Sequence, residues 1–333
     1  MRRAHEWWHS DPRPAISVVL ATTQRARLLR GALEGLAAQT LPRSVFEVIV
    51  IDDGSTDSTR DVVASFESAL TVRYAYQRPA GLSSARNHGI FSSSGDIVLF
   101  LDDDDVASPD LLEQHLRAHC LHPEPRDAVL GFTGLASEVA SDPLMRFVTE
   151  VEGHLFSYGS IASREALDFR HFWGGRTSCK RVFLLDHGVF NPAFRIFCED
   201  IELAYRLSKH DLRVFYHPGA VSLMHRAIPL EGFCERLHRQ GQANYRFSQL
   251  HDDEAVHAWT GVRDAQRAWP SVAAHYDDTI LAARHADRLA RLKLESGLTL
   301  ESSDLHWLHC AYSAAFRAAK MKGIVDASTV NRA

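Results

Sequence analysis

The chain has 333 residues, and its hydrophobic content of 45% and charged content of 24% are those of a globular protein. Its net charge of −5 does not favour a nucleic-acid partner, and it has no apolar run of about 18 residues that would cross a membrane. Its five cysteines are dispersed without a CxxC spacing, which favours reduced thiols in a cytoplasmic protein over a disulfide framework or a zinc site.

The first hundred residues predict alternating strands and helices. Continuous apolar runs predict buried strands, and apolar residues at helical spacing predict the helices between them. In chain order we expect a strand at 15–21, a helix at 25–40, a strand from 46, a helix from 59, a strand at 71–76, a loop leading into a helix at 81–94, and a strand at 97–101. This order is typical of a parallel sheet with helices on both faces, which binds ligands beyond the carboxyl ends of its strands.

Two of these strands end in acids. The run from Phe46 ends in Asp52 and Asp53, and "IVLFLDDDD" ends in four consecutive aspartates, Asp102 to Asp105. Adjacent carboxylates repel one another unless a cation or basic side chains lie among them. A solvated acidic loop is the alternative for either stretch alone. Two acidic strand ends in one sheet instead predict a cation or ligand site at one edge.

The second half of the chain changes from strands to helices. We expect a glycine-bearing loop and a short helix within 172–190, a helix at 199–211, and two short strands at 213–218 and 220–226. From about residue 230 the pattern is helical, over 230–250, 271–295 and 303–322. We therefore divide the chain into an N-terminal tail (1–13), an α/β domain (14–229) and a helical C-terminal extension (230–333).

Six segments in this order resemble the family 2 glycosyltransferases of the GT-A fold. They are "ISVVLATTQRARLL", "VIVIDDGSTDST", "GLSSARNHGI", "GDIVLFLDDDDVASPDLL", the glycine pair 174–175 and "EDIELAYRL". The resemblance covers about 14–230. It implies a mostly parallel central sheet flanked by helices, and an inverting hexosyl transfer from a nucleoside-diphosphate sugar that is usually assisted by Mg²⁺ or Mn²⁺. Cell-envelope polysaccharide assembly is the commonest setting of such enzymes.

The resemblance also assigns the metal ligands. The D-x-D pattern of the family corresponds to Asp102 and Asp104, so that Asp104 binds the metal and Asp102 contacts the ribose or the metal. His225 corresponds to a region where metal-dependent members often carry a further ligand. Carboxylate oxygens suit Mg²⁺ and Mn²⁺, and the cation offsets the charge that develops on the leaving diphosphate. For Asp105, capping of the next turn is an equal alternative.

The nucleotide pocket is expected at Thr22, Asp52, Asp53, Arg86 and Asp102. By resemblance, Asp52 and Asp53 recognise the base, and a carboxylate accepts the N3–H of uracil, which cytosine lacks. This favours a UDP-sugar over a CMP-sugar, and a dTDP-sugar fits as well. The family usually has a tyrosine where this chain reads "ATTQR". Arg86 pairs with phosphate or with Asp52, and an internal salt bridge is its structural alternative.

The resemblance implies that the chemistry rests on Glu199 and Asp200. Asp200 matches the base that deprotonates the acceptor hydroxyl, and Glu199 would orient the acceptor. Helix capping is the alternative for either acid. Trp173, Gly174, Gly175 and Arg176 match a loop that approaches the donor sugar and the acceptor, with Arg176 where the family often has asparagine.

The partners that follow are a UDP-sugar donor and a carbohydrate, lipid-linked or other hydroxyl acceptor. The arginines of the 230–250 helix leave open a peripheral contact with the inner face of a membrane, and packing or a homodimer through the C-terminal helices is the alternative. A catalytically silent nucleotide-sugar-binding or scaffold protein, and a nucleotidyltransferase of related fold, are the competing functions.

Overall fold

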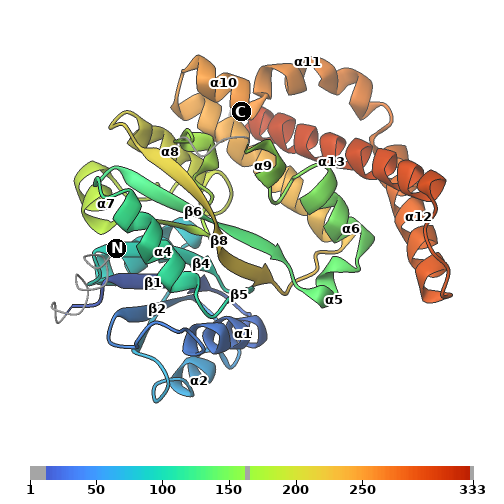
Figure 1. Cartoon of the computed structure of the whole chain (residues 1–333). Helices are drawn as coiled ribbons and strands as arrows, with labels where there is room; N and C mark the ends of the chain where they lie inside the picture. Colours follow the sequence, from blue (N-terminus) through green and yellow to red (C-terminus); the bar gives the residue numbers. More distant parts are fainter. Residues whose placement is uncertain (1–12, 162–165, 331–333) are drawn as a thin grey trace. The chain divides into compact units, whose positions relative to one another are not determined.

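The computed structural model describes residues 13–161 and 166–330, which form two compact units (Figure 1). The first unit holds the described residues up to Val139 together with Tyr158–Arg226. The second holds Ala140–Ser157 and the described residues from Ala227 on. Residues 140–157, which the sequence analysis places in the α/β domain, thus pack with the C-terminal helices. Of the expected N-terminal tail, only Arg13 lies within the described residues, and the functional division of the chain stays a prediction.

The first unit contains a mixed sheet. Its eight strands are β1 (Ile16–Thr22), β2 (Phe46–Asp53), β3 (Val72–Gln77), β4 (Ile97–Asp102), β5 (Asp105–Ala107), β6 (Asp127–Leu135), β7 (Thr177–Lys180) and β8 (Arg213–Met224). They lie in the order β3-β2-β1-β4-β7-β6-β8-β5. The first four are mutually parallel, as the sequence predicts, and β7 is antiparallel to both β4 and β6.

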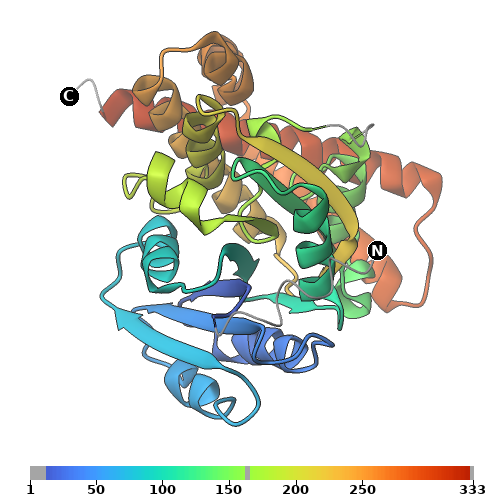
Figure 2. The same ribbon diagram turned by 60° about the vertical axis from the view of Figure 1, so that its left-hand side comes forward.

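Helices cover both faces of the parallel half of this sheet. One core cluster joins alternate residues of β1 and β2 to α1 (Ala26–Ala37) and α2 (Thr59–Ala64). Ile49 and Ile51, whose side chains point the other way, pack with Ala85 of α3 (Leu82–Ser92). Because both faces are covered, these strands are apolar throughout rather than alternating. Figure 2 shows the blue strands side by side, with α2 and α3 on opposite faces.

The remaining helices of the first unit are α4 (Leu111–Leu121), α7 (Arg181–His187) and α8 (Glu199–Ser208), with single 3₁₀ turns at Tyr158–Ser160 and Phe169–His171. The short α5 (Ser137–Ala140) lies where the first segment of this unit ends. Two expectations fail here. The two short strands predicted at 213–226 form one strand, β8, whose pairing with β6 shifts register between Leu130 and Phe132. A strand, β7, also precedes the helix expected in 172–190.

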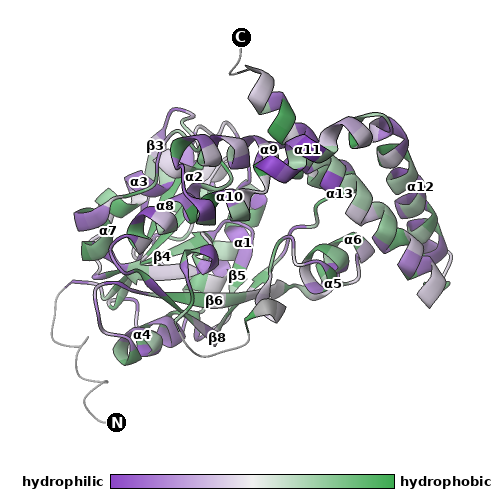
Figure 3. Cartoon of the chain, turned by 90° about the horizontal axis from the view of Figure 1, so that it is seen from above, coloured by the Kyte–Doolittle hydropathy of each residue, from purple (hydrophilic) through white to green (hydrophobic). Residues whose placement is uncertain are grey.

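The second unit is helical. It contains α6 (Pro143–Arg146), a π-helical turn (Phe147–Val151), α9 (Leu230–Leu250), α10 (Glu254–Thr260), α11 (Val262–Ala273), α12 (Tyr276–Glu295) and α13 (Ser302–Val330). Phe147 packs among His309, Tyr312 and Phe316 of α13. The ribbon of α12 carries both hydrophilic and hydrophobic residues (Figure 3), and Leu289 and Leu292 of this helix are exposed. In the described residues, no helix has both the length and the apolar character needed to cross a membrane.

Candidate functional site

The pairing of the strands brings the predicted acids to one edge of the sheet. Thr22 at the end of β1 is opposite Asp52 of β2, and Ala21 is opposite Asp102 of β4. The two acidic strand ends therefore flank the end of β1. The convergence that the sequence predicts is present, with one strand between the two groups.

The two acids of β2 are held by different neighbours. Asp52 is buried, and its carboxylate accepts hydrogen bonds from the Tyr74 hydroxyl at 2.7 Å and the Ser55 amide at 2.7 Å. Asp53 is only partly buried and accepts from the Gln77 side chain and from the amides of Ala80 and Gly81, at 2.7–2.8 Å. Of the two, Asp53 is the more accessible to a ligand.

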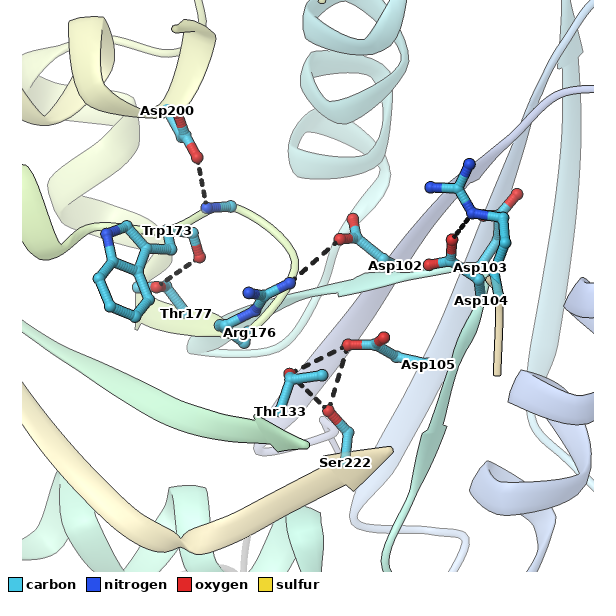
Figure 4. A network of polar contacts seen from close by, with 12 residues as sticks. Asp102, Asp103, Asp104, Asp105, Thr133, Trp173, Arg176, Thr177, Asp200 and Ser222 are labelled. Atoms are coloured by element: carbon cyan, nitrogen blue, oxygen red, sulfur yellow. Dashed lines mark hydrogen bonds and ion pairs between the residues drawn. The ribbon is translucent and has the colours of Figure 1, made fainter. Parts of the chain in front are cut away.

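The four consecutive aspartates have four different surroundings (Figure 4). Asp102 is the open one, with a third of its side chain exposed, whereas Asp103, Asp104 and Asp105 are buried. Asp103 accepts from the Thr22 hydroxyl at 2.7 Å. Asp105 does not cap a turn: it lies on β5 and accepts from the hydroxyls of Thr133 and Ser222, which corrects the capping alternative.

Arginines from distant segments lie among these acids. Arg25 contacts Asp103 at 2.9 Å and Asp104 at 3.8 Å. Arg226 pairs with Asp104, and Arg176 lies 3.5 Å from Asp102. The cations offset the mutual repulsion of the carboxylates. Sequence reasoning missed Arg25 and Arg226, although a run of buried acids itself requires basic partners.

Burial governs the protonation of the two buried acids Asp103 and Asp105. It raises the pKa of Asp103, which Arg25 opposes, and it raises the pKa of Asp105, which Arg176 opposes. In both cases the low-polarity surroundings penalise the charged carboxylate more than the arginine favours it. The exposed Asp102 is therefore the carboxylate best placed to meet a cation or a ligand.

The glycine pair lies directly against the site. A Cβ added to Gly175, whose φ is +125°, would lie 2.2 Å from Oδ2 of Asp102. A Cβ on Gly174 would lie 2.5 Å from the guanidinium of Arg86. Only glycine allows this approach and this conformation without strain. Beside the pair, Trp173 is partly buried, donates to the Arg170 carbonyl at 2.8 Å and packs edge-on against Tyr158.

The acids at the start of α8 face the same loop. Oδ2 of Asp200 accepts from the Gly174 amide at 2.8 Å, and Oδ1 accepts from the Ile201 amide at 2.8 Å. These two bonds fix the orientation of the carboxylate, and each oxygen keeps a further lone pair for a ligand. Neither acid is the N-cap, which is Cys198 in a left-handed conformation and makes no side-chain capping bond.

Arg86 joins these parts of the site. Its Nη1 contacts Oε1 of Glu199 at 2.8 Å, and its Nη2 contacts Oδ1 of Asp102 at 3.2 Å and the Gly174 carbonyl at 2.9 Å. The expected pair with Asp52 is wrong, because the Arg86 side chain extends toward α8, whereas Asp52 bonds to Tyr74 and Ser55. The internal salt bridge, considered as the structural alternative, is present.

Glu199 is buried and only half satisfied. Arg86 occupies one oxygen, and within the described part of the chain Oε2 has no hydrogen-bond partner. Burial raises the pKa of Glu199 well above its ordinary value, the charge of Asp200 adds to the rise, and Arg86 opposes it. A buried carboxyl oxygen without a partner is costly, so a ligand hydroxyl that reached it would be favoured.

The donor set suits a divalent cation by its chemistry. Asp102 and Asp104 offer hard carboxylate oxygens two residues apart, and Mg²⁺ and Mn²⁺ readily take their other ligands from phosphate and water. Across 13–161 and 166–330 the chain has no cluster of three His, Cys, Asp or Glu groups that could hold a metal alone. The His225 amide donates to the Asp104 carbonyl at 2.9 Å, while its imidazole contacts Glu138 at 2.5 Å.

Comparison with known proteins identifies the family. Residues 17–138 match the family described as Glycosyl transferase family 2. The segment 17–138 of this chain therefore belongs to glycosyl transferase family 2. The validoxylamine A glucosyltransferase of Streptomyces hygroscopicus subsp. jinggangensis (strain 5008) is 34% identical over 222 residues, which cover 60% of this chain and 52% of that protein. A homologue of the same name from subsp. limoneus is also 34% identical, over 60% of this chain and 49% of its own length. The chain thus spans about half the length of these relatives.

Solved structures support the GT-A fold of this chain. A mannosyltransferase from Pyrobaculum calidifontis, in complex with GDP-Man and Mn²⁺, matches with a TM-score of 0.56 and 21% identity, over 94% of this chain and 91% of that chain. S. aureus TarS 1-349, in complex with UDP, matches with a TM-score of 0.51 and 16% identity, over 95% and 91%. The predicted fold class, a mostly parallel sheet flanked by helices with further helices at the C-terminus, is confirmed.

Proposed function

We propose that this family 2 member transfers a hexosyl group from a nucleoside-diphosphate sugar to an acceptor hydroxyl, with inversion at the anomeric carbon. One observation carries the proposal. Arg86 bridges Asp102 and Glu199, and the Gly174 amide bonds Asp200. These contacts hold Asp102, the strand-end acid that suits a diphosphate and its cation, beside Asp200, the acid that suits a general base.

The chemistry follows from those positions. Asp200 takes the proton of the acceptor hydroxyl while the oxygen of that hydroxyl bonds to the anomeric carbon of the donor sugar. The bond from the anomeric carbon to the diphosphate breaks in the same step. Backbone amides orient Asp200, so its free lone pairs point the same way in every turnover. Asp102 and Asp104 would hold the divalent cation, which when bound would supply positive charge opposite the leaving diphosphate. Glu199 and the loop of Trp173, Gly174, Gly175 and Arg176 orient the acceptor and the donor sugar.

We further propose a UDP-sugar as the donor, with a dTDP-sugar as the variant that the same contact accepts. Asp53 and Thr22 lie at the ends of neighbouring strands, and Asp53 is the acid of β2 that a base can reach. The Pyrobaculum relative of similar fold was solved with GDP-Man, and a guanine also offers N–H groups to a carboxylate. A GDP-sugar must therefore be included among the donors that are tested.

The test is a donor panel with product detection. UDP-, dTDP-, GDP- and CMP-sugars are incubated with the chain in Mn²⁺, in Mg²⁺ and in EDTA, and nucleotide release is measured with simple sugars as acceptors. We expect release from UDP- or dTDP-sugars that depends on the cation. Turnover with a GDP-sugar alone would overturn the base assignment. Nucleotide binding without turnover of any donor would favour the silent binder.

A nucleotidyltransferase is separated by its product. Such an enzyme would release pyrophosphate from a nucleoside triphosphate and a sugar phosphate, so the same protein is assayed for pyrophosphate. We expect none. The acceptor, a carbohydrate or lipid-linked hydroxyl, stays a proposal, as do a peripheral membrane contact and a homodimer through the C-terminal helices.

A further inference from the structure

Asp104, an acid of the proposed cation site, is already neutralised by two arginines. Its side chain is 5% exposed, and its carboxylate pairs with Arg226 and, at 3.8 Å, with Arg25. Arg226 follows the end of β8, and the amide of the preceding residue, His225, donates to the Asp104 carbonyl. This backbone contact holds the segment 225–226 beside Asp104, so the Arg226 guanidinium lies close to the Asp104 carboxylate.

The two arginines differ in the ion pairs that they would retain if Asp104 bound a cation. Arg25 would retain its shorter contact with Asp103, 2.9 Å away. For Arg226, the contact with Asp104 is the ion pair that the structure gives it. Its side chain is 30% exposed, so it has a route away from the carboxylate. A guanidinium and a divalent cation on one carboxylate repel each other, and Arg226 is the partner free to move.

The backbone contact of His225 with Asp104 limits where the Arg226 guanidinium can move. The His225 amide stays bonded to the Asp104 carbonyl, so the guanidinium of the next residue remains within a side-chain length of any ion there. A diphosphate that shares this ion brings negative oxygens into that range. The planar fork of arginine suits phosphate oxygens, and weak hydration lowers the cost of the exchange.

We propose that Arg226 is a donor-binding residue that exchanges its partner: it neutralises Asp104 in the empty site and binds the diphosphate when donor and cation enter. This inference rests on the proposed function of the site. In the empty protein Arg226 competes with the cation, and in the loaded protein it assists the nucleotide. The cation and the nucleotide are therefore expected to bind cooperatively.

The exchange predicts opposite effects of one substitution. In Arg226→Gln the competing charge is gone, so Mn²⁺ alone should bind about five-fold more tightly, as followed by the electron paramagnetic resonance of free Mn²⁺. UDP in saturating Mn²⁺ should bind about ten-fold more weakly by calorimetry, because a charge-assisted phosphate contact is lost. Arg226→Lys keeps the charge and should leave Mn²⁺ binding close to wild type, with an intermediate loss for UDP.

Arg213→Gln is the matched control. Arg213 also pairs with a buried aspartate, Asp127, but that pair joins the starts of β8 and β6, at the far end of these strands from Asp105. It should change neither affinity. Circular dichroism melting shows whether each variant is folded, and the lysine variant supplies the comparison if the glutamine variant is not.

Each outcome is decisive. Opposite shifts of the two affinities support the exchange. Weakening of both, or no change in UDP affinity, would reduce Arg226 to a structural residue and overturn the inference while leaving the proposed function intact. Wild-type protein that binds neither UDP, dTDP nor GDP in Mn²⁺ would overturn the proposed function, and the inference would fall with it.

Discussion

Arg86 of α3 contacts Glu199 of α8 at 2.8 Å, although 113 residues separate them in the chain. The second guanidinium nitrogen reaches Asp102 at the end of β4 and the carbonyl of Gly174. Both Arg86 and Glu199 are almost fully buried. A buried pair of this kind is held by several hydrogen bonds at once, so removal of either partner leaves an uncompensated charge.

Arg86→Met is expected to destabilise the protein by about 3 kcal/mol and to abolish measurable turnover. The methionine replaces the guanidinium that lies over the rings of Phe100 and Phe190 with an apolar group that can still pack there, but it cannot satisfy Glu199. Chemical denaturation measures the loss of stability. Nucleotide release, assayed under conditions where the variant is folded, measures the loss of turnover. Arg206→Met, which removes an ion-pair partner of buried Glu202 elsewhere on α8, is the control: it should lower stability and spare turnover per folded molecule. Equal turnover losses in the two variants would contradict the role of Arg86.

Gly175→Ala is expected to distort Asp102 and to weaken nucleotide binding at least ten-fold. The added methyl would overlap the Asp102 carboxylate, and the positive φ adds strain of about 1–3 kcal/mol. Gly297→Ala is the matched control, since Gly297 also has a positive φ, of 76°, but its Cβ would meet no atom within 4 Å. The control isolates the backbone strain from the contact with Asp102. If both variants bound UDP as the wild type does, the close approach would have no functional role.

A buried histidine pair is expected to oppose stability in mild acid, with the opposite sign to the buried acids Asp103, Asp105 and Glu199, whose raised pKa values favour the folded state there. His115 and His119 of α4 both bond the Ser178 hydroxyl at 2.8 Å, and burial lowers the pKa of His115 to about 3 and that of His119 well below its ordinary value. Below the unfolded pKa of about 6.5 the unfolded chain takes up protons that the folded chain refuses. His115 alone should therefore cost about 2 kcal/mol of stability between pH 7 and pH 5, and the loss should continue toward pH 3.

Urea unfolding at pH 7 and pH 5 checks this dependence. His115→Asn removes the titrating group, so the change in stability from pH 7 to pH 5 should be about 2 kcal/mol more favourable than in the wild type, whatever the effect of the substitution at pH 7. His306→Asn, at an exposed position of α13, should leave the dependence as in the wild type. An unchanged slope in the His115 variant would contradict the contribution assigned to His115.

The fold of the first hundred residues could be predicted because each buried strand is a continuous apolar run that ends in a turn or in acids. β7 could not, since "TSCK" has no apolar pattern and its strand character comes from pairing with β4 and β6. The acids of the site could be predicted because they follow strands directly. Arg25, Arg176 and Arg226 approach them from three distant segments, and only the folded chain shows which carboxylate each one meets.

The role of Asp200 is the central claim, and Asp200→Asn tests it most directly. The asparagine oxygen can still accept the Gly174 amide bond, but it cannot take a proton from the acceptor. With the donor that the panel identifies, single-turnover transfer should fall at least a hundred-fold, while calorimetry should give wild-type affinity for the nucleoside diphosphate and its cation. Transfer at the wild-type rate by the folded variant would contradict the account.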